Sequence, residues 1–165
     1  MRLLRLLVLL LGAACGAGSA QALCLPVLCS CTVGTTPLLF GSYNPLAHGH
    51  TDSSASIKVD CGGVAGLLIP YNVAISAGGS GSFANRHMSL GAHQLGYNLY
   101  TDAARSTVWG DGTAATLLMS ASITLDVLGL APQQTHWVYG RLPGRQLGAV
   151  PGIYTDTLSV TLTYY

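Results

Sequence analysis

The sequence predicts a single domain of the all-β class with the architecture of a β-sandwich. Three observations lead to this prediction. Apolar and polar residues alternate with period two in several short stretches, which is typical of half-buried strands. Turn-forming residues separate these stretches, and 21 of the 165 residues are glycine. Glu is absent and charged residues make up only 8% of the chain, so long amphipathic helices would lack residues for their polar face.

The predicted strands follow one another along the chain, each bounded by turn residues. They cover residues 56–61, 71–76, 95–100, 137–142 and 158–164. The last one alternates most clearly, because Leu158, Val160, Leu162 and Tyr164 fall on one face, with Ser or Thr at the positions between. Turns are predicted at residues 44–45, 62–63, 110–112, 143–144 and 151–152. Residues 114–130 stay ambiguous, since one bent strand, two strands with a bulge, or a short helical turn would fit their composition.

The first 22 residues have the layout of a secretory signal peptide. Arg2 and Arg5 precede an unbroken apolar run at residues 6–11, and an Ala-Gln-Ala cleavage motif ends at Ala22. We therefore expect residues 23–165 to form the exported domain. The apolar run is too short for a stable membrane span and no second one follows, so stable membrane insertion is not expected.

Charge is sparse in the expected mature chain. Five basic residues stand against six Asp, which gives a formal charge of −1. The basic residues do not cluster, so nucleic acid is an unexpected partner.

The predicted domain contains four cysteines, Cys24, Cys29, Cys31 and Cys61. An even number in an exported chain implies disulfides, and four cysteines allow three pairings. A bond between Cys29 and Cys31 would close a very small ring and is the least favourable. The pairing that we favour is Cys31–Cys61, which leaves Cys24–Cys29 as a possible second bond.

No arrangement of side chains indicates an enzyme, a cofactor or a metal site. His48 and His50 could share one face of a strand, but Asn-Pro and Gly residues around them favour a loop. The acids are isolated Asp residues, and no serine lies in a Gly-x-Ser-x-Gly elbow with its structural setting. Asp102 and Arg105 are predicted to close a turn as a local ion pair, and Trp109 is predicted to pack at a strand end.

Several longer motifs resemble the spore coat protein U domain family. They are Cys31-Thr-Val, Phe40-Gly-Ser-Tyr43-Asn-Pro45, Arg86-His-Met88-Ser-Leu-Gly91, Leu95-Gly-Tyr97-Asn-Leu99-Tyr100-Thr-Asp102-Ala-Ala-Arg105, Trp109-Gly-Asp-Gly112, Val138-Tyr-Gly-Arg141 and Gly152-Ile-Tyr154-Thr-Asp156. The resemblance covers nearly all of the expected mature chain. It implies an incomplete immunoglobulin-like (pilin) β-sandwich, with one strand supplied in trans.

The same resemblance implies a structural subunit of an extracellular chaperone–usher pilus. Its expected partners are a periplasmic chaperone, an outer-membrane usher and neighbouring subunits, and it would travel through the periplasm to the cell surface or an extracellular fibre. The C-terminal region also resembles the chaperone-recognised edge of pilins. We therefore expect Gly152, Leu158, Val160, Leu162 and Tyr164 to take part in strand complementation.

The N-terminal region departs from the pattern of polymerising pilins. Only residues 23–30 precede Cys31 in the expected mature chain, and they contain two cysteines and Pro26. The subunit is therefore expected to accept a strand but to donate one poorly, which favours an end or tip position with a role in adhesion and biofilm formation. The alternatives are a secreted, non-polymeric coat protein with the same domain and, less favoured, an exported hydrolase.

Overall fold

The computed structural model describes residues 28–128, 130–131 and 133–165. The predicted signal peptide, residues 1–22, lies outside the described residues. Within them, the chain forms short strands and one 3₁₀ turn: β1 (Cys29–Thr35), β2 (Thr51–Gly63), β3 (Leu68–Ile75), η1 (Gly78–Ser80), β4 (His87–Leu90), β5 (His93–Gly96), β6 (Asn98–Tyr100), β7 (Met119–Thr124), β8 (Gln134–Leu142) and β9 (Val160–Tyr164). No helix in this part of the chain is long and apolar enough to cross a membrane.

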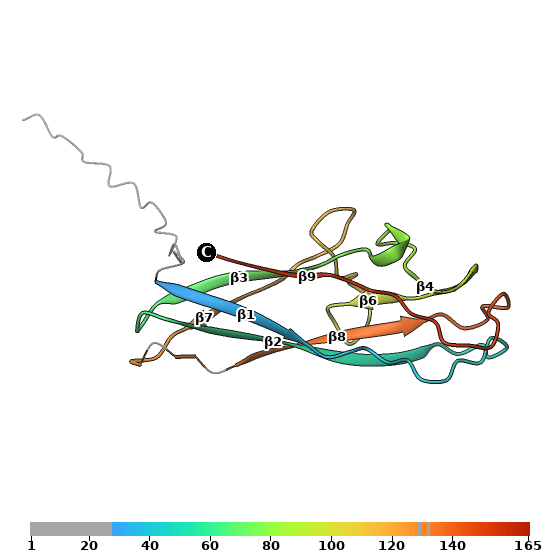
Figure 1. The fold of residues 1–165 in the computed structure, drawn as a ribbon, viewed down its shortest axis with the longest axis horizontal. Helices are drawn as coiled ribbons and strands as arrows, with labels where there is room; N and C mark the ends of the chain where they lie inside the picture. Colours follow the sequence, from blue (N-terminus) through green and yellow to red (C-terminus); the bar gives the residue numbers. More distant parts are fainter. Residues whose placement is uncertain (1–27, 129, 132) are drawn as a thin grey trace, which may run out of the picture.

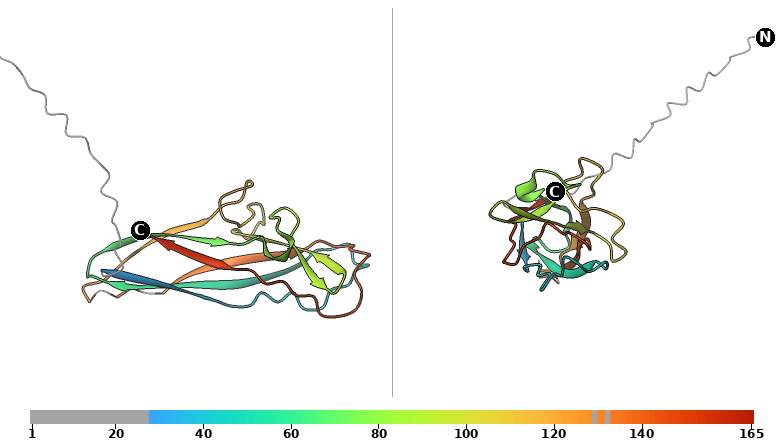
Figure 2. Two further views of the ribbon diagram at one scale, coloured as in Figure 1. Left: turned by 45° about the horizontal axis from the view of Figure 1, so that its top comes forward. Right: turned by 90° about the vertical axis from the view of Figure 1, so that its right-hand side faces the viewer.

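The strands form two antiparallel layers and a small hairpin. One layer has the order β1-β2-β8-β6 and the other has the order β7-β3-β9, while β4 and β5 pair with each other. The molecule is elongated along the strands (Figures 1 and 2). These layers confirm the predicted all-β sandwich.

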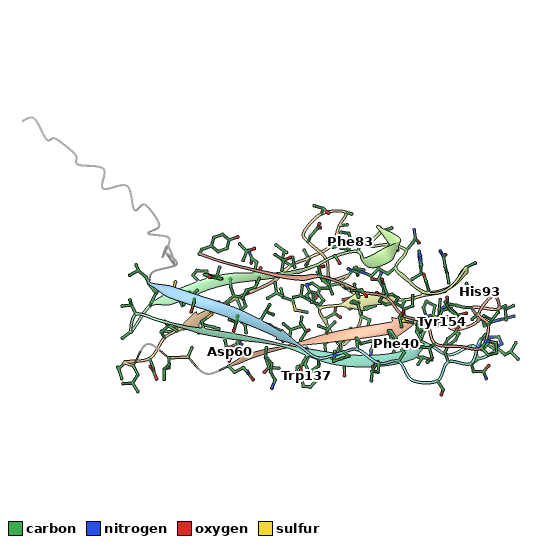
Figure 3. The ribbon with its side chains drawn as sticks, in the orientation of Figure 1. Phe40, Asp60, Phe83, His93, Trp137 and Tyr154 are labelled. Atoms are coloured by element: carbon green, nitrogen blue, oxygen red, sulfur yellow. A yellow bond between two sulfur atoms is a disulfide. The ribbon has the colours of Figure 1, made fainter. Side chains whose placement is uncertain are left out.

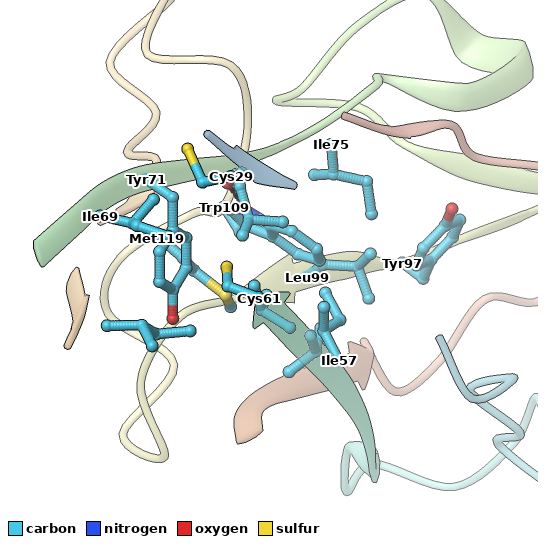
Figure 4. Close-up of a cluster of buried hydrophobic side chains, with 14 of the residues drawn as sticks. Cys29, Ile57, Cys61, Ile69, Tyr71, Ile75, Tyr97, Leu99, Trp109 and Met119 are labelled. Carbon is cyan, nitrogen blue, oxygen red and sulfur yellow. Dashed lines mark hydrogen bonds between the residues drawn. The ribbon is translucent and has the colours of Figure 1, made fainter. Parts of the chain in front are cut away.

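The core lies between the layers and follows the period-two pattern. Ile57 and Val59 of β2 face Ile69, Tyr71 and Val73 of β3, and all five are buried. Figure 4 shows side chains from both layers gathered in this space. Burial of alternating residues on two facing sheets is the main stabilising contribution in such a sandwich.

Two stretches differ in detail from the sequence prediction. Residues 95–100 keep their alternation but form two strands, since β5 pairs with β4 whereas β6 pairs with β8. The chain changes partner at Tyr97, whose amide donates to the carbonyl of Arg86. Among the described residues of the ambiguous segment 114–130, only Met119–Thr124 is a strand, and it is preceded by Ala114 and Ala115 at positive φ.

The predicted ion pair between Asp102 and Arg105 is wrong. The Asp102 carboxylate instead accepts hydrogen bonds from the backbone amides of Ser106 and Thr107 at 2.8–3.2 Å, which closes the turn. Arg105 extends to Asp52 on β2, with 3.3 Å between Nε and Oδ1. The short separation in sequence favoured a pair between Asp102 and Arg105, but the Asp102 carboxylate accepts hydrogen bonds from the backbone amides of its own turn instead.

Candidate functional site

Two neighbouring strands on one side of the sandwich have an unpaired edge. Among the described residues, β1 pairs only with β2, and β9 pairs only with β3. The two strands belong to different layers, and the end of β9 lies at the same end of the molecule as the beginning of β1 (Figures 1 and 2). They therefore run in opposite directions along an open side of the sandwich.

The register of β9 shows which backbone groups face this open side. The amide of Ser76 donates to the Ser159 carbonyl, and the amide of Tyr165 donates to the Pro70 carbonyl. Hydrogen-bonded and non-hydrogen-bonded pairs alternate in an antiparallel ladder. Every second residue from Ser159 to Tyr165 therefore directs its backbone N–H and C=O toward β3. The residues between them, Val160, Leu162 and Tyr164, direct these groups away from β3, toward the unpaired edge.

An apolar cavity of about 420 Å³ lies between the two edges, and we call it the edge groove. The first wall is formed by residues 35–40, which begin at the last residue of β1, and the second wall by residues 154–156, 158 and 160, which end at the first residue of β9. The floor contains buried core side chains, among them Ile57, Leu99, Trp109 and Val138. A cavity with apolar walls and two backbone edges has the shape and the chemistry to take up a β-strand.

A second apolar cavity of about 650 Å³ adjoins the edge groove at Leu38, Phe40, Met88 and Tyr154. It extends past Tyr154 to Gly152 and the loop before it. The hollow on this side of the sandwich therefore continues beyond the edge groove, toward the loops after β8.

The first wall is held against β2 and β8. The Oγ of Ser53 donates to the Leu39 carbonyl at 2.6 Å. Leu38 and Phe40 pack over Gly140, where a Cβ atom would lie 2.8 Å from Cζ of Phe40. Gly140 therefore lets this segment approach β8 closely, and any larger residue there would push the wall outward.

The second wall is fixed by Asp156. Its Oδ2 accepts a hydrogen bond of 2.7 Å from the Tyr97 hydroxyl, and its Oδ1 accepts one of 2.9 Å from the amide of Gly79. Burial and the Asp156 carboxylate raise the pKa of Tyr97, so its hydroxyl stays protonated and donates. Asp156 thus connects the segment before β9 to the core and to the turn after β3.

A buried arginine supports the groove from behind. Arg86 is 1% exposed, and its guanidinium donates to Oδ1 of Asn98 and to the carbonyls of Ser76 and Trp109 at 2.8–3.0 Å. Burial lowers the pKa of Arg86. Trp109 is itself 1% exposed and donates from Nε1 to the Val73 carbonyl, so Arg86 and Trp109 together join β3, β6 and the groove floor.

The predicted site residues lie along this open side, but at different places. Leu158 and Val160 line the edge groove. Leu162 and Tyr164 lie on the same face farther along β9, half-buried against the core and opposite Val73 and Tyr71. Gly152 borders the second cavity, where a Cβ atom would collide with Leu90. Their contact with a partner strand stays a prediction.

The first wall and the buried arginine were not predicted from the sequence. Residues 36–40 contain Pro37 and do not alternate as a strand, so nothing marked them as part of a site. One feature of the sequence could have pointed to Arg86. It is one of only five basic residues after the predicted signal peptide, and it lies beside apolar strands. A rare charge in such a position can indicate a buried hydrogen-bonding role.

The disulfide of this region joins Cys31 and Cys61, the pairing that the sequence favoured. The two residues are directly opposite in β1 and β2, with 2.02 Å between the sulfurs and 4.1 Å between the Cα atoms. The bond therefore ties the edge strand β1 to the centre of its layer. The predicted Cys24–Cys29 bond involves Cys24, which lies outside the described residues.

His48 and His50 lie in a loop, as the sequence predicted. His48 and His50 are exposed in the connection between β1 and β2. The described part of the chain contains no group of three or more His, Cys, Asp or Glu side chains that could hold a metal ion.

The comparison with protein families decides the family of the chain. The model for the Spore Coat Protein U domain matches residues 19–161. The chain belongs to this family. The comparison with curated proteins finds no match.

A solved structure has the same fold. It is a chain in the crystal structure of the CsuC–CsuE chaperone–tip adhesion subunit pre-assembly complex, from the archaic chaperone-usher Csu pili of Acinetobacter baumannii. The TM-score is 0.55 at 21% sequence identity, over 82% of the present chain and 40% of the matched chain. The present chain thus spans less than half of the matched one, and the likeness at this identity concerns the fold.

Proposed function

We propose that this Spore Coat Protein U domain protein is a structural subunit of an extracellular chaperone–usher pilus. The edge groove is the observation that carries the proposal, because it lies between the two unpaired strands where β1 ends and β9 begins, and because its floor consists of buried core side chains. A strand from a periplasmic chaperone fills the groove first, and a strand from a neighbouring subunit replaces it at the usher. The family supports this assignment, and so does the fold shared with a chain of a chaperone–tip adhesion subunit pre-assembly complex.

The chemistry of the groove explains why a partner is needed. An unpaired, apolar sheet edge promotes edge-to-edge aggregation. An incoming strand pairs with the backbone groups of Val160, Leu162 and Tyr164 and inserts its alternate side chains above Leu99 and Trp109. The chain therefore acts as a strand acceptor and not as an enzyme.

We further propose a position at the end of the fibre, with adhesion to surfaces as the role. Large apolar side chains are exposed where the connections β2–β3 and β7–β8 lie side by side: Val64, Val127, Leu128 and Leu130 on the connections themselves, and Leu68 at the start of β3. Val127 is 88% exposed and Leu128 is 77% exposed. Exposed apolar residues gathered in this way are typical of interaction sites, and an apolar surface is the ligand that they suit.

Co-expression with and without the cognate periplasmic chaperone tests the proposal. With the chaperone, we expect a soluble one-to-one complex, and without it we expect most of the subunit to aggregate or be degraded, so that only a small soluble fraction is recovered. Equal yields of soluble, monomeric subunit in both cases would contradict strand acceptance. A subunit that folds alone and forms no complex would instead favour the secreted, non-polymeric coat protein.

A further inference from the structure

The outer face of the layer β1-β2-β8-β6 carries a row of aromatic side chains. Trp137 and Tyr139 alternate outward on β8, and Tyr100 of β6 lies opposite Tyr139. Trp137 is 55% exposed, and Figure 3 shows it on the outer side of β2 and β8. Polar side chains normally occupy the outer face of an antiparallel sheet, so an exposed tryptophan beside two tyrosines is unexpected.

Two arginines lie along the same row and share one carboxylate. Arg141 forms a two-pronged ion pair with Asp52, with distances of 2.8 and 2.9 Å. Arg105 also contacts Asp52, at 3.3 Å, and its guanidinium lies 5.9 Å from the ring centre of Tyr139. The cluster therefore keeps an excess of one positive charge in a chain whose predicted mature form is slightly acidic.

The row continues into a polar pocket of about 710 Å³, which Tyr100 and Arg141 border. Other lining residues are Arg86, His50, His87 and Gln94, and no Asp lines this pocket. The Arg86 guanidinium is buried and donates to Asn98, Ser76 and Trp109 inside the protein, so Arg141, which is partly exposed, is the cationic group that a ligand in this pocket reaches. The pocket has the size of a ligand site, and its cationic and imidazole groups suit an anion.

We propose that this face binds an acidic polysaccharide. Its carboxylate groups occupy the pocket beside Arg141, and neighbouring sugar rings lie on the exposed face of Trp137. The distance along β8 from Trp137 to Arg141 is about 13 Å at roughly 3.3 Å per residue, so the site suits an extended chain better than a single sugar. Aromatic faces contact the apolar side of a ring, while guanidinium groups select its charge.

The aromatic row of the proposed site lies on the opposite face of its layer from the edge groove, and Tyr97 is the one residue that lines both the polar pocket and the groove. Trp137 and Tyr139 point away from the core, whereas the groove floor is formed by inward residues such as Val138. Binding of the polysaccharide therefore does not depend on strand acceptance, and the two proposals can fail independently.

The experiment measures binding of oligoalginate, a polymer of uronic acids, to the full chain purified with its groove filled by the chaperone. Neutral malto-oligosaccharide and oligothymidine serve as comparison ligands. The chain has two tryptophans, and Trp109 is buried, so the part of the protection from a fluorescence quencher that is lost in the Trp137→Ala complex reports on Trp137. We expect oligoalginate to protect Trp137 and to bind more weakly as salt is raised.

Two variants test the roles of the face. Trp137→Ala should weaken oligoalginate binding by about tenfold or more. Arg141→Gln should remove the preference for the acidic over the neutral ligand, and Arg105 remains to contact Asp52 in this variant. Leu147→Ala, at an exposed apolar residue outside the row, is the matched control and should bind as the unchanged chain does.

Three outcomes would overturn the proposal. The first is that oligoalginate does not bind, or binds no better than the neutral ligand. The second is that Trp137→Ala and the control bind it equally. The third is that oligothymidine binds more tightly than oligoalginate, which would assign the face to single-stranded nucleic acid.

Discussion

Replacing Val160 with Asp tests the edge groove with a single charge. The Val160 side chain lines the groove, and Asp156 already provides one carboxylate there. In the free subunit the groove is open, so the new carboxylate can stay hydrated and the fold should survive. Once a strand fills the groove, the same carboxylate is desolvated without a cationic partner.

The expected effect is large in the complex. Loss of the valine side chain, which the inserted strand would cover, costs about 1.5 kcal/mol, and desolvation of an unpaired carboxylate adds several kcal/mol in proteins. A total of about 4 kcal/mol weakens binding of the chaperone strand about a thousandfold.

The matched control is Thr161→Asp. Thr161 is the next residue on β9, but it is exposed on the opposite face, so its substitution should change binding by less than about 0.5 kcal/mol. The assay is the yield and dissociation constant of the subunit–chaperone complex for the two variants. Equal recovery of both complexes would refute the assignment of this face of β9 to the groove.

Three further predictions concern stability. Arg86→Met should lower the free energy of unfolding by about 3–5 kcal/mol in denaturant titration, since three acceptors around the buried guanidinium lose their donor, and Arg86→Lys should recover only part of it. His136 lies 2.6 Å from the Tyr71 hydroxyl, and burial lowers its pKa, so the folded state favours the neutral ring. Its contribution should be complete above the unfolded pKa of about 6.5 and be lost as pH falls through the lower folded pKa; thermal melts of His136→Gln should lack that part of the pH dependence. Replacing both Cys31 and Cys61 by Ser should cost roughly 3–4 kcal/mol in the same titration, and an unchanged stability would contradict a bonded pair in the folded chain.

The parts of the fold that the sequence predicted follow from local patterns. Alternation of apolar and polar residues predicted which face of residues 158–164 is buried, and the structure has Leu158 and Val160 on that face. This works because a strand has a fixed period of two, so one apolar series defines the inward side.

The missed parts depend on contacts between distant segments. The change of partner at Tyr97 leaves the alternation intact, so no pattern could reveal it. Arg105 contacts Asp52 from a distant part of the sequence, whereas the spacing along the chain favoured a pair with Asp102. The first wall of the groove forms because Gly140 admits Leu38 and Phe40, a steric relation between separate segments.

Hydrogen exchange along β9 tests strand acceptance most directly. In the free subunit, the amides of Val160 and Leu162 face the unpaired edge and should exchange rapidly, while those of Thr161 and Thr163 face β3 and should be protected. Binding of the chaperone should protect Val160 and Leu162 and leave the two threonines nearly unchanged. Protection of all four amides in the free subunit, with no change in the complex, would contradict an open acceptor edge.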